Sequence, residues 1–313
     1  MGEAATTGQG VTTILVSDDD AEQRIDNFLL SRLKGVPKSR IYRLLRKGEL
    51  RVNKGRIKPE YRLQCGDIIR VPPIRVSESP PKAAPGAAMR SHLETSILFE
   101  NDELLVINKP SGLAVHGGSG VNLGLIEALR ATRPEMTLEL VHRLDRGTSG
   151  CLLVAKKKAA LRHLQRQLRD HSVEKVYLAL VDGSWPKGLD VMDAPLSKTT
   201  NTSGEKFVRA NKDGKRALTR FKVRKRHTGM SLLEVTLETG RTHQIRVHCQ
   251  LAGHPLLGDD KYGNDERNTE MRRLGLKRLF LHAYRLSFSL PSSGERISVE
   301  APLPDDLAAI SSL

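Results

Sequence analysis

Residues 141–150 read VHRLDRGTSG and are followed at once by the apolar segment CLLVA at 151–155. The apolar run predicts a buried strand, and Gly147 and Gly150 predict a turn that another backbone can approach closely. Asp145 stands in this turn between Arg143 and Arg146. The two positive charges would hold the carboxylate ionised and could also bind phosphate groups. The segment therefore predicts a core strand with a charged functional turn at its start.

Two other interpretations of this turn fit the residues alone. Its ion pairs could be purely structural, with Asp145 capping the turn on the surface of the protein. A Ser-His-Asp hydrolase is the second interpretation, because His142, Asp145 and Ser149 lie within eight residues of one another. It is the weaker one, since GTSG lacks the G-x-S-x-G elbow and triad members normally come from separate segments.

Outward from this turn, short apolar segments alternate irregularly with a few helical patterns. This order predicts an α+β domain over residues 96–313, with a mixed, largely antiparallel sheet flanked by helices. In GRTHQIRVH (240–248) we expect a helix with Thr242 as its N-cap. The other strand segments are ILFE, LLVINK, KVYLALV, RFKVRKR, LLEVTLET and RLSFSL, and the other helical ones are GLIEALRAT and KAALRHLQRQLRD.

A second, smaller domain is expected over residues 21–83. RIDNFLLSRL and SRIYRLLRKG place apolar residues at helical spacing, with Ser39 as a plausible N-cap and Gly48 as the end of the second helix. LRVNKGRI and GDIIRV then predict short strands around a turn. Residues 1–17 suggest a loosely ordered arm, and the Pro, Ala and Ser of residues 84–95 suggest a semi-extended linker.

Positive charge is abundant and concentrated. The chain has 51 Lys and Arg against 36 Asp and Glu, a net charge of +15 and a pI near 9.9, which indicates a polyanionic partner, either nucleic acid or a membrane surface. Residues 21–60 hold twelve of the basic residues against four acidic ones. We favour a phosphate-binding surface that includes Arg40, Arg43 and Lys54 over a merely solvated helix face.

Several function classes find no support in the sequence. There is no run of about 18 apolar residues and no signal-peptide pattern, so we expect a cytoplasmic protein without a membrane span. No G-x-G-x-x-G, phosphate loop or H-E-x-x-H occurs, and the three cysteines lack C-x-x-C spacing. His243 and His248 are five residues apart, which does not suit a metal pair. Neither a metal nor a nucleotide cofactor is therefore expected.

These segments resemble two known families. HRLDRGTSG matches the H-R-L-D-x-x-T-S-G signature of the RluA-type pseudouridine synthases, and further segments similar to that family follow in the same order. They are KPSGLAVHGGSG at 109–120, the strand around Tyr177, GRTHQIRVH at 240–248 and GHPLLGDDKYG at 253–263. Residues 24–26, Ser39, Arg40 and 52–67 resemble the S4 RNA-binding domain.

The resemblance implies roles for individual residues. Asp145 would be the catalytic carboxylate, and Tyr177 would stack on the uracil or remove its C5 proton. Arg246 would pair with Asp145, with an exchange of roles between Arg241 and Arg246 as the alternative. The remaining residues would contact RNA: His142, Arg143, Arg146, Arg241 and His243 in the catalytic domain, and Arg40, Arg43 and Lys54 in the S4-like domain.

The implied reaction is the isomerisation of uridine to pseudouridine in large-subunit ribosomal RNA or a precursor particle, by one chain acting as a monomer. The bond from ribose C1′ to uracil N1 breaks and the base rejoins through C5 without net gain or loss of atoms, so no cofactor is needed. Attack at C6, attack at C1′ and a glycal route all remain open. A transfer RNA substrate and a non-catalytic RNA-binding ribosome-assembly factor are the alternatives.

Overall fold

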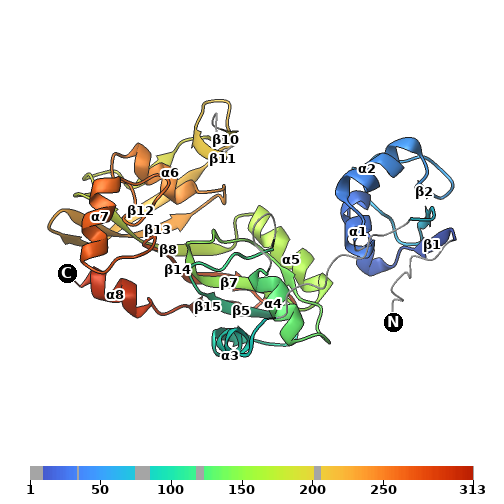
Figure 1. The fold of residues 1–313 in the computed structure, drawn as a ribbon, viewed down its shortest axis with the longest axis horizontal. Helices are drawn as coiled ribbons and strands as arrows, with labels where there is room; N and C mark the ends of the chain where they lie inside the picture. Colours follow the sequence, from blue (N-terminus) through green and yellow to red (C-terminus); the bar gives the residue numbers. More distant parts are fainter. Residues whose placement is uncertain (1–9, 34, 75–84, 118–122, 201–205, 313) are drawn as a thin grey trace. The chain divides into compact units, whose positions relative to one another are not determined.

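The computed structural model describes residues 10–33, 35–74, 85–117, 123–200 and 206–312. The chain divides into two compact units, Met1–Lys82 and Ala83–Leu313 (Figure 1). In the described ranges, no helix has the length and apolar character needed to cross a membrane.

The N-terminal unit packs two helices on a small antiparallel sheet. Its strands run in the order β1 (Thr12–Leu15), β3 (Ile68–Val71) and β2 (Arg51–Val52), and its helices are α1 (Ile25–Arg32) and α2 (Lys38–Lys47). The prediction of a loose arm is wrong for residues 12–15, because β1 pairs with β3 along its whole length. The core of the unit contains Phe28, Leu29, Ile41 and Leu44, all fully buried.

The ends of α2 partly agree with the sequence. Gly48 ends the helix in the left-handed conformation, with φ of 69°, as predicted. The N-cap prediction is wrong, because the helix begins at Lys38 directly after Pro37 and Ser39 lies inside it. Proline has its φ fixed near the helical value and has no N–H to satisfy, so it suits a helix start.

The C-terminal unit is built on one mixed, largely antiparallel sheet, which confirms the predicted fold class. The strand order is β4-β5-β7-β14-β8-β13-β12-β9, and the pair β7 and β14 is parallel whereas the other neighbours are antiparallel. The bounds are β4 Ile97–Glu100, β5 Leu104–Lys109, β7 Ser149–Ala155, β8 Glu174–Asp182, β9 Val191–Asp193, β12 Leu218–His227, β13 Met230–Leu237 and β14 Leu281–Ser289.

Smaller strands and helices surround this sheet (Figure 1). The strands β6 (Glu139–Leu140) and β15 (Arg296–Glu300) pair with β7 and β14, and β10 (Leu196–Thr200) and β11 (Lys206–Ala210) form a separate two-stranded sheet. The helices are α3 (Ala87–Thr95), α4 (Leu125–Thr132), α5 (Lys158–Arg169), α6 (Gln244–Leu251), α7 (Asp265–Arg273) and α8 (Asp305–Ser311).

The predicted linker is wrong over residues 87–95, which form α3. Leu93 of this helix is fully buried in the main core, and Met89 packs against the same cluster. The sequence around them is rich in small residues, so the helical apolar period is carried by too few positions to stand out.

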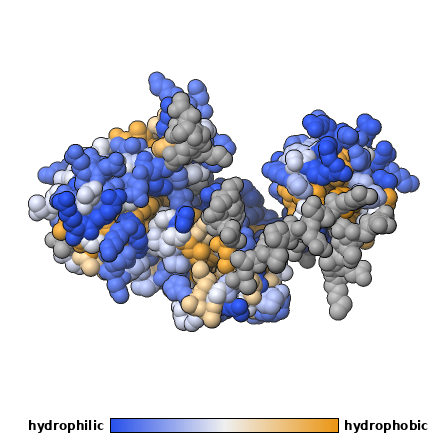
Figure 2. All heavy atoms as spheres, viewed as in Figure 1, coloured by the Kyte–Doolittle hydropathy of each residue, from blue (hydrophilic) through white to orange (hydrophobic). Residues whose placement is uncertain are grey.

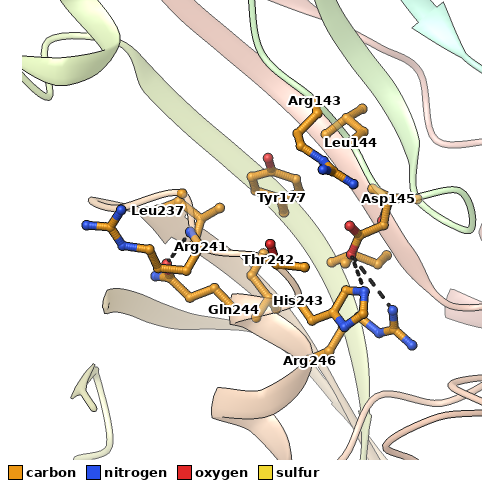
Figure 3. Close-up of a pocket in the computed structure, with 14 residues that line it drawn as sticks. Arg143, Leu144, Asp145, Tyr177, Leu237, Arg241, Thr242, His243, Gln244 and Arg246 are labelled. Atoms are coloured by element: carbon orange, nitrogen blue, oxygen red, sulfur yellow. Dashed lines mark hydrogen bonds and ion pairs between the residues drawn. The ribbon is translucent and has the colours of Figure 1, made fainter. Parts of the chain in front are cut away.

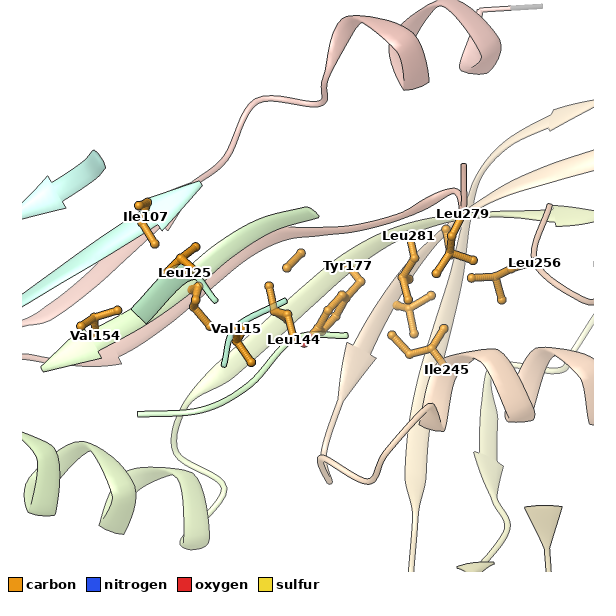
Figure 4. Close-up of a cluster of buried hydrophobic side chains, with 14 of the residues drawn as sticks. Ile107, Val115, Leu125, Leu144, Val154, Tyr177, Ile245, Leu256, Leu279 and Leu281 are labelled. Carbon is orange, nitrogen blue, oxygen red and sulfur yellow. The ribbon is translucent and has the colours of Figure 1, made fainter. Parts of the chain in front are cut away.

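Apolar side chains form a continuous core along the sheet and beneath the turn that carries Asp145. Leu144, Tyr177, Ile245 and Leu281 belong to one buried cluster, although they come from four separate segments (Figure 4). Burying a side chain of this size contributes about 1.5–3 kcal/mol. In Figure 2 hydrophilic residues cover most of the visible surface of both units. The core therefore fixes the backbone on both sides of Asp145.

Candidate active site

A pocket opens where the turn before β7 faces the segment that leads into α6 (Figure 3). Strand β8 forms its floor with Tyr177, and Leu237 comes from the end of β13. Six of the residues predicted for the site line this pocket: Arg143, Asp145, Tyr177, Arg241, His243 and Arg246. The structure thus brings together polar groups that are up to 103 positions apart in the sequence, from Arg143 to Arg246.

Asp145 faces two basic side chains across this pocket. Its Oδ2 atom lies 3.8 Å from Nε2 of His243 and 3.8 Å from Nη1 of Arg246, and 20% of its side chain is exposed. The turn that carries it is closed by a 3.1 Å hydrogen bond from the N–H of Thr148 to the carbonyl of Asp145. The carboxylate is therefore held in a fixed turn but stays open to a ligand.

Lys109, which was not predicted as a site residue, stabilises this turn through a hydrogen bond to its backbone. Its fully buried Nζ donates to the carbonyl oxygens of Pro110, Leu113 and Arg146 at 2.8, 2.9 and 3.2 Å. Burial lowers the pKa of Lys109 to about 7, while the charge of Asp145 acts in the opposite direction. It belongs to the segment at 109–120, whose residues 118–120 lie outside the described ranges.

Tyr177 presents its ring to the pocket between Arg143 and Thr242 (Figure 3). The residue is 7% exposed. Burial raises the pKa of Tyr177 well above its usual range, and the nearby carboxylate of Asp145 adds to the increase. Its hydroxyl therefore keeps its proton, and the residue lines the pocket with an aromatic ring whose faces are flat and apolar.

A buried polar network fixes the start of α6. Oε1 of Gln244 accepts hydrogen bonds from Oγ1 of Thr239 and the N–H of Arg241 at 2.8 and 3.0 Å, and its Nε2 donates to Oγ1 of Thr219 at 2.9 Å. The prediction of Thr242 as N-cap is wrong, because His243 directly precedes the helix and has φ of 54°. The network replaces the side-chain cap and orients His243 and Arg246 toward Asp145.

Arg246 is held from its other side by Asp259. Its Nε and Nη2 atoms donate to the two carboxylate oxygens at 2.7 Å each, and its guanidinium also lies 4.9 Å from the ring centre of Tyr262. Burial lowers the pKa of Arg246, but its hydrogen bonds to Asp259 and the charges of Asp259 and Asp145 outweigh burial and raise it. Arg246 is therefore a permanent cation in the pocket.

The arrangement can stabilise negative charge and hold a flat ring beside a carboxylate. Within the described ranges, no group of three or more His, Cys, Asp or Glu side chains is placed to hold a metal ion.

The comparisons with known proteins agree with this geometry. Residues 103–251 match the RNA pseudouridylate synthase family, and residues 23–69 match the S4 domain family. The protein named ribosomal large subunit pseudouridine synthase C of Pasteurella multocida (strain Pm70) is 56% identical over 96% of this chain and 93% of its own. The chain belongs to the pseudouridine synthase family. It is an isomerase with an S4 domain in front of its catalytic domain.

Other members of the family support the same assignment. The protein of the same name from Haemophilus influenzae (strain ATCC 51907 / DSM 11121 / KW20 / Rd) is 54% identical over 96% of this chain and 94% of its own. The solved structure of human RNA pseudouridylate synthase domain containing 1 is 30% identical, with a TM-score of 0.57 over 72% of this chain and 90% of that one. The solved structure of human RNA pseudouridylate synthase domain containing 4 is 28% identical, with a TM-score of 0.59 over 71% of this chain and 94% of that one.

Three of the predicted contact residues lie differently from the others in this pseudouridine synthase. Nε2 of His142 accepts a 3.1 Å hydrogen bond from the N–H of Leu153, and burial lowers the pKa of His142 to about 4. Nε of Arg146 donates to the carbonyl of Gly112 at 2.9 Å. Neither His142 nor Arg146 lines the pocket. The guanidinium of Arg241 lines the pocket but points away from Asp145 (Figure 3).

The hydrolase interpretation is wrong on geometry. Ser149 does not face His142 but forms a buried 2.9 Å hydrogen bond with His282 and accepts another from Arg278 at 3.0 Å. These contacts tie the start of β7 to β14 and leave no nucleophile-base pair at Asp145.

The remaining predicted residues lie in the S4 domain. Arg40 and Arg43 of α2 line a pocket with Arg46. Lys54 is exposed in the turn after β2, where its φ is 67°. These side chains present positive charge on one helix and the turn that follows the next strand.

Sequence reasoning missed Lys109, Asp259 and Tyr262. All three lie in segments that resemble the family, at 109–120 and 253–263, and Asp259 stands beside a second aspartate. A signal was available for Lys109 alone, since a lysine that ends a largely apolar strand must enter the interior or leave it abruptly.

Proposed function

We propose that this pseudouridine synthase isomerises specific uridines of large-subunit ribosomal RNA, with Asp145 as its catalytic carboxylate. The observation that carries the proposal is the position of Asp145, open to a ligand and flanked by Tyr177 and Arg246 in one pocket. The substrate class is supported by relatives more than 50% identical over nearly their whole length, whose names specify the large subunit.

In the proposed reaction the carboxylate attacks the uridine or stabilises the cationic ribose that forms when the C1′–N1 bond breaks. The ring of Tyr177 stacks on the uracil, and its raised pKa favours stacking over proton removal. Arg246 supplies a fixed positive charge next to the carboxylate. The base rejoins C1′ through C5, its N1 gains the proton that C5 loses, and no co-reactant is consumed.

RNA binding is assigned to basic side chains around and away from the pocket. Arg143 and Arg241 lie at the pocket, and Arg40, Arg43 and Lys54 lie in the S4 domain. Their phosphate contacts would offset the cost of unstacking the uridine, roughly a few kcal/mol. We assign His142 and Arg146 supporting roles, because their side chains bond the turn to neighbouring backbone, that of Leu153 in β7 and that of Gly112. The proposal includes action in the cytoplasm by a monomer.

The test is tritium release from large-subunit ribosomal RNA labelled with [5-³H]uridine. Wild-type protein should release tritium without added metal or nucleotide, whereas Asp145→Asn should bind the RNA with nearly unchanged affinity and release none. Asp260→Asn is the matched control, because its carboxylate is 83% exposed and pairs with Arg272. Release from transfer RNA alone would replace the proposed substrate, and turnover by Asp145→Asn would remove the carboxylate from the mechanism.

A further inference from the structure

His243 adopts an unusual backbone conformation inside the pocket. Its φ of 54° and ψ of 21° place it in the left-handed region, and it is the only described non-glycine residue with positive φ that lines this pocket. Few non-glycine residues adopt this region, although Asn, Asp and His do so more often than others. A strained residue held at an active site often marks a geometric requirement, so the position of its ring needs an explanation.

A chain of two hydrogen bonds fixes the protonation of the His243 ring. The N–H of Val208 donates to the hydroxyl oxygen of Tyr262 at 3.0 Å, and that oxygen lies 2.8 Å from Nδ1 of His243. Burial raises the pKa of Tyr262, so its hydroxyl keeps its proton. With the oxygen accepting from Val208, Nδ1 is the acceptor placed within hydrogen-bond distance of the hydroxyl, so we direct the hydroxyl proton to Nδ1. A neutral His243 must then carry its own proton on Nε2.

The protonated nitrogen faces the carboxylate. Nε2 lies 3.8 Å from Oδ2 of Asp145, so an N–H points at the oxygen, whereas the other tautomer would direct a lone pair at a negative charge. The separation exceeds a hydrogen bond by nearly an ångström, and contacts of this kind commonly shorten when substrate binds.

We propose that His243 is a positioning residue that presents its Nε2–H to Oδ2 of Asp145, in a tautomer set by Tyr262 and the backbone of Val208. The inference rests on the proposed function, in which Asp145 is the reacting carboxylate. Oδ2 is thereby occupied by His243 and Arg246, and Oδ1 is left for the uridine. Because Val208 belongs to β11, the small β10–β11 sheet is linked to the carboxylate through two side chains.

Burial favours the neutral form of the His243 ring. Burial lowers the pKa of His243, and the positive charges of Arg246 and Lys261 act in the same direction, whereas Asp145 and Asp259 oppose them. Protonation would place a hydrogen on Nδ1 and leave the hydroxyl of Tyr262 without its acceptor. The Nε2–H tautomer is therefore the form present at neutral pH.

The first test reads the tautomer directly. In a long-range ¹H–¹⁵N spectrum of the full-length ¹⁵N-labelled protein, the His243 signals are identified by their loss in His243→Gln. We expect an unprotonated Nδ1 and a protonated Nε2 at neutral pH. In Tyr262→Phe the ring should become a mixture of tautomers and take up a proton at higher pH than in the wild type. A wild-type ring with its proton on Nδ1, or doubly protonated, would overturn the inference.

The second test is single-turnover isomerisation. His243→Asn tolerates the backbone conformation but is too short to reach Asp145, and it should slow the reaction about 10- to 100-fold, the range for losing a hydrogen bond to a charged group. His243→Gln can extend an N–H to the Nε2 position and should recover most of the rate. Equal rates for the Asn and Gln variants would overturn the donor role.

Two controls separate this inference from the proposed function. His171→Asn is matched for backbone strain, since His171 has φ of 57° and lies outside the pocket, and its rate should stay unchanged. Fluorescence of Trp185, the single tryptophan, confirms that each variant is folded. An inactive wild type, or an active Asp145→Asn, would contradict the proposed function, whereas an active wild type with unaffected His243 variants would contradict only the inference.

Discussion

Arg246 is joined to Asp259 by two hydrogen bonds of 2.7 Å, and this pairing leaves Nη1 of the same guanidinium 3.8 Å from Asp145. The side chain of Asp259 is fully buried and also accepts hydrogen bonds from the N–H groups of Lys261 and Tyr262 at 2.9 and 3.0 Å. Asp259 thus holds the cation of the active site without facing the pocket itself.

Asp259→Asn should lower both stability and rate. It leaves a buried guanidinium with half of its counter-charge, and removing one partner of a buried pair typically costs about 3–5 kcal/mol. We expect the midpoint of unfolding by urea, followed by Trp185 fluorescence, to decrease, and the single-turnover rate to fall with little change in RNA affinity.

Asp260→Asn is the control for this change because the two aspartates are adjacent and differ in burial. Asp260 is exposed and its bond to Arg272 lies on the surface, where ion pairs contribute at most about 1 kcal/mol. If the two variants had the same stability and the same rate, Asp259 would have no special part in placing Arg246.

Gly150→Ala should destabilise the catalytic domain severely. Gly150 has φ of 107°, and a Cβ there would lie 2.2 Å from the carbonyl oxygen of Ala283, on the parallel neighbour strand. Steric overlap and backbone strain together should cost roughly 3 kcal/mol or more. The measurement is the free energy of unfolding by urea, again followed by Trp185 fluorescence.

Gly294→Ala separates the two causes. Gly294 has φ of 71°, but a Cβ added there would meet no atom within 4 Å, so this position carries the backbone strain alone. We expect a loss of about 1–2 kcal/mol. A Gly150→Ala variant no less stable than Gly294→Ala would show that β7 and β14 can separate at this point without cost.

Apolar patterns in the sequence predicted the fold class, and the resemblance to the RluA-type segments named most of the residues that line the pocket. Strand and helix segments are readable from apolar spacing, and Asp145, Tyr177 and Arg246 lie in segments that match the family. His142 lies three positions before Asp145, yet its ring turns to the backbone of Leu153. Closeness in sequence therefore did not predict a shared pocket.

The residues that escaped prediction depend on tertiary contacts. Asp259 and Asp260 are the same residue type in the same loop, and only the folded structure shows that one is buried against Arg246. Likewise, Leu93 is the one fully buried residue of α3. A single apolar anchor gives no helical period, so the sequence of this helix indicates a linker. Patterns of single residues cannot show which neighbour will arrive from 13 or more positions away, as Asp259 does for Arg246.

Asp26 should make the stability of the S4 domain depend on acid. Its carboxylate accepts hydrogen bonds from Arg24 at 2.7 and 3.1 Å and from Tyr42 at 2.6 Å, and chiefly the bond to Arg24 lowers the pKa of Asp26 to about 2. In the unfolded chain the pKa of an aspartate is about 3.9, so this contribution is present above about pH 4 and is lost as pH falls toward 2. Solvent at the partly exposed Arg24 limits it to roughly 1–2 kcal/mol.

Asp26→Asn tests this in the full-length chain with two probes. Circular dichroism reports both domains, whereas fluorescence reports only the catalytic domain, which holds the single tryptophan. At pH 7 the substitution should lower the midpoint of unfolding of the S4 domain, followed by circular dichroism in urea. It should leave the midpoint of the fluorescence transition unchanged. Its S4 domain should also lose less stability than the wild type between pH 4 and pH 2. A parallel loss in both proteins would show that Asp26 is not the titrating group.

Replacing Arg40 and Arg43 with Gln should weaken RNA binding without slowing the bound complex. Both line a pocket of the S4 domain and carry exposed or half-buried guanidinium groups that can neutralise phosphates. Each phosphate contact releases about one counterion, so the double variant should reduce the slope of log affinity against log salt by about 2. The double variant Arg62→Gln and Arg70→Gln removes the same charge from the same domain outside α2, where both side chains contact backbone carbonyls. If both double variants changed the slope equally, general charge rather than this pocket would hold the RNA.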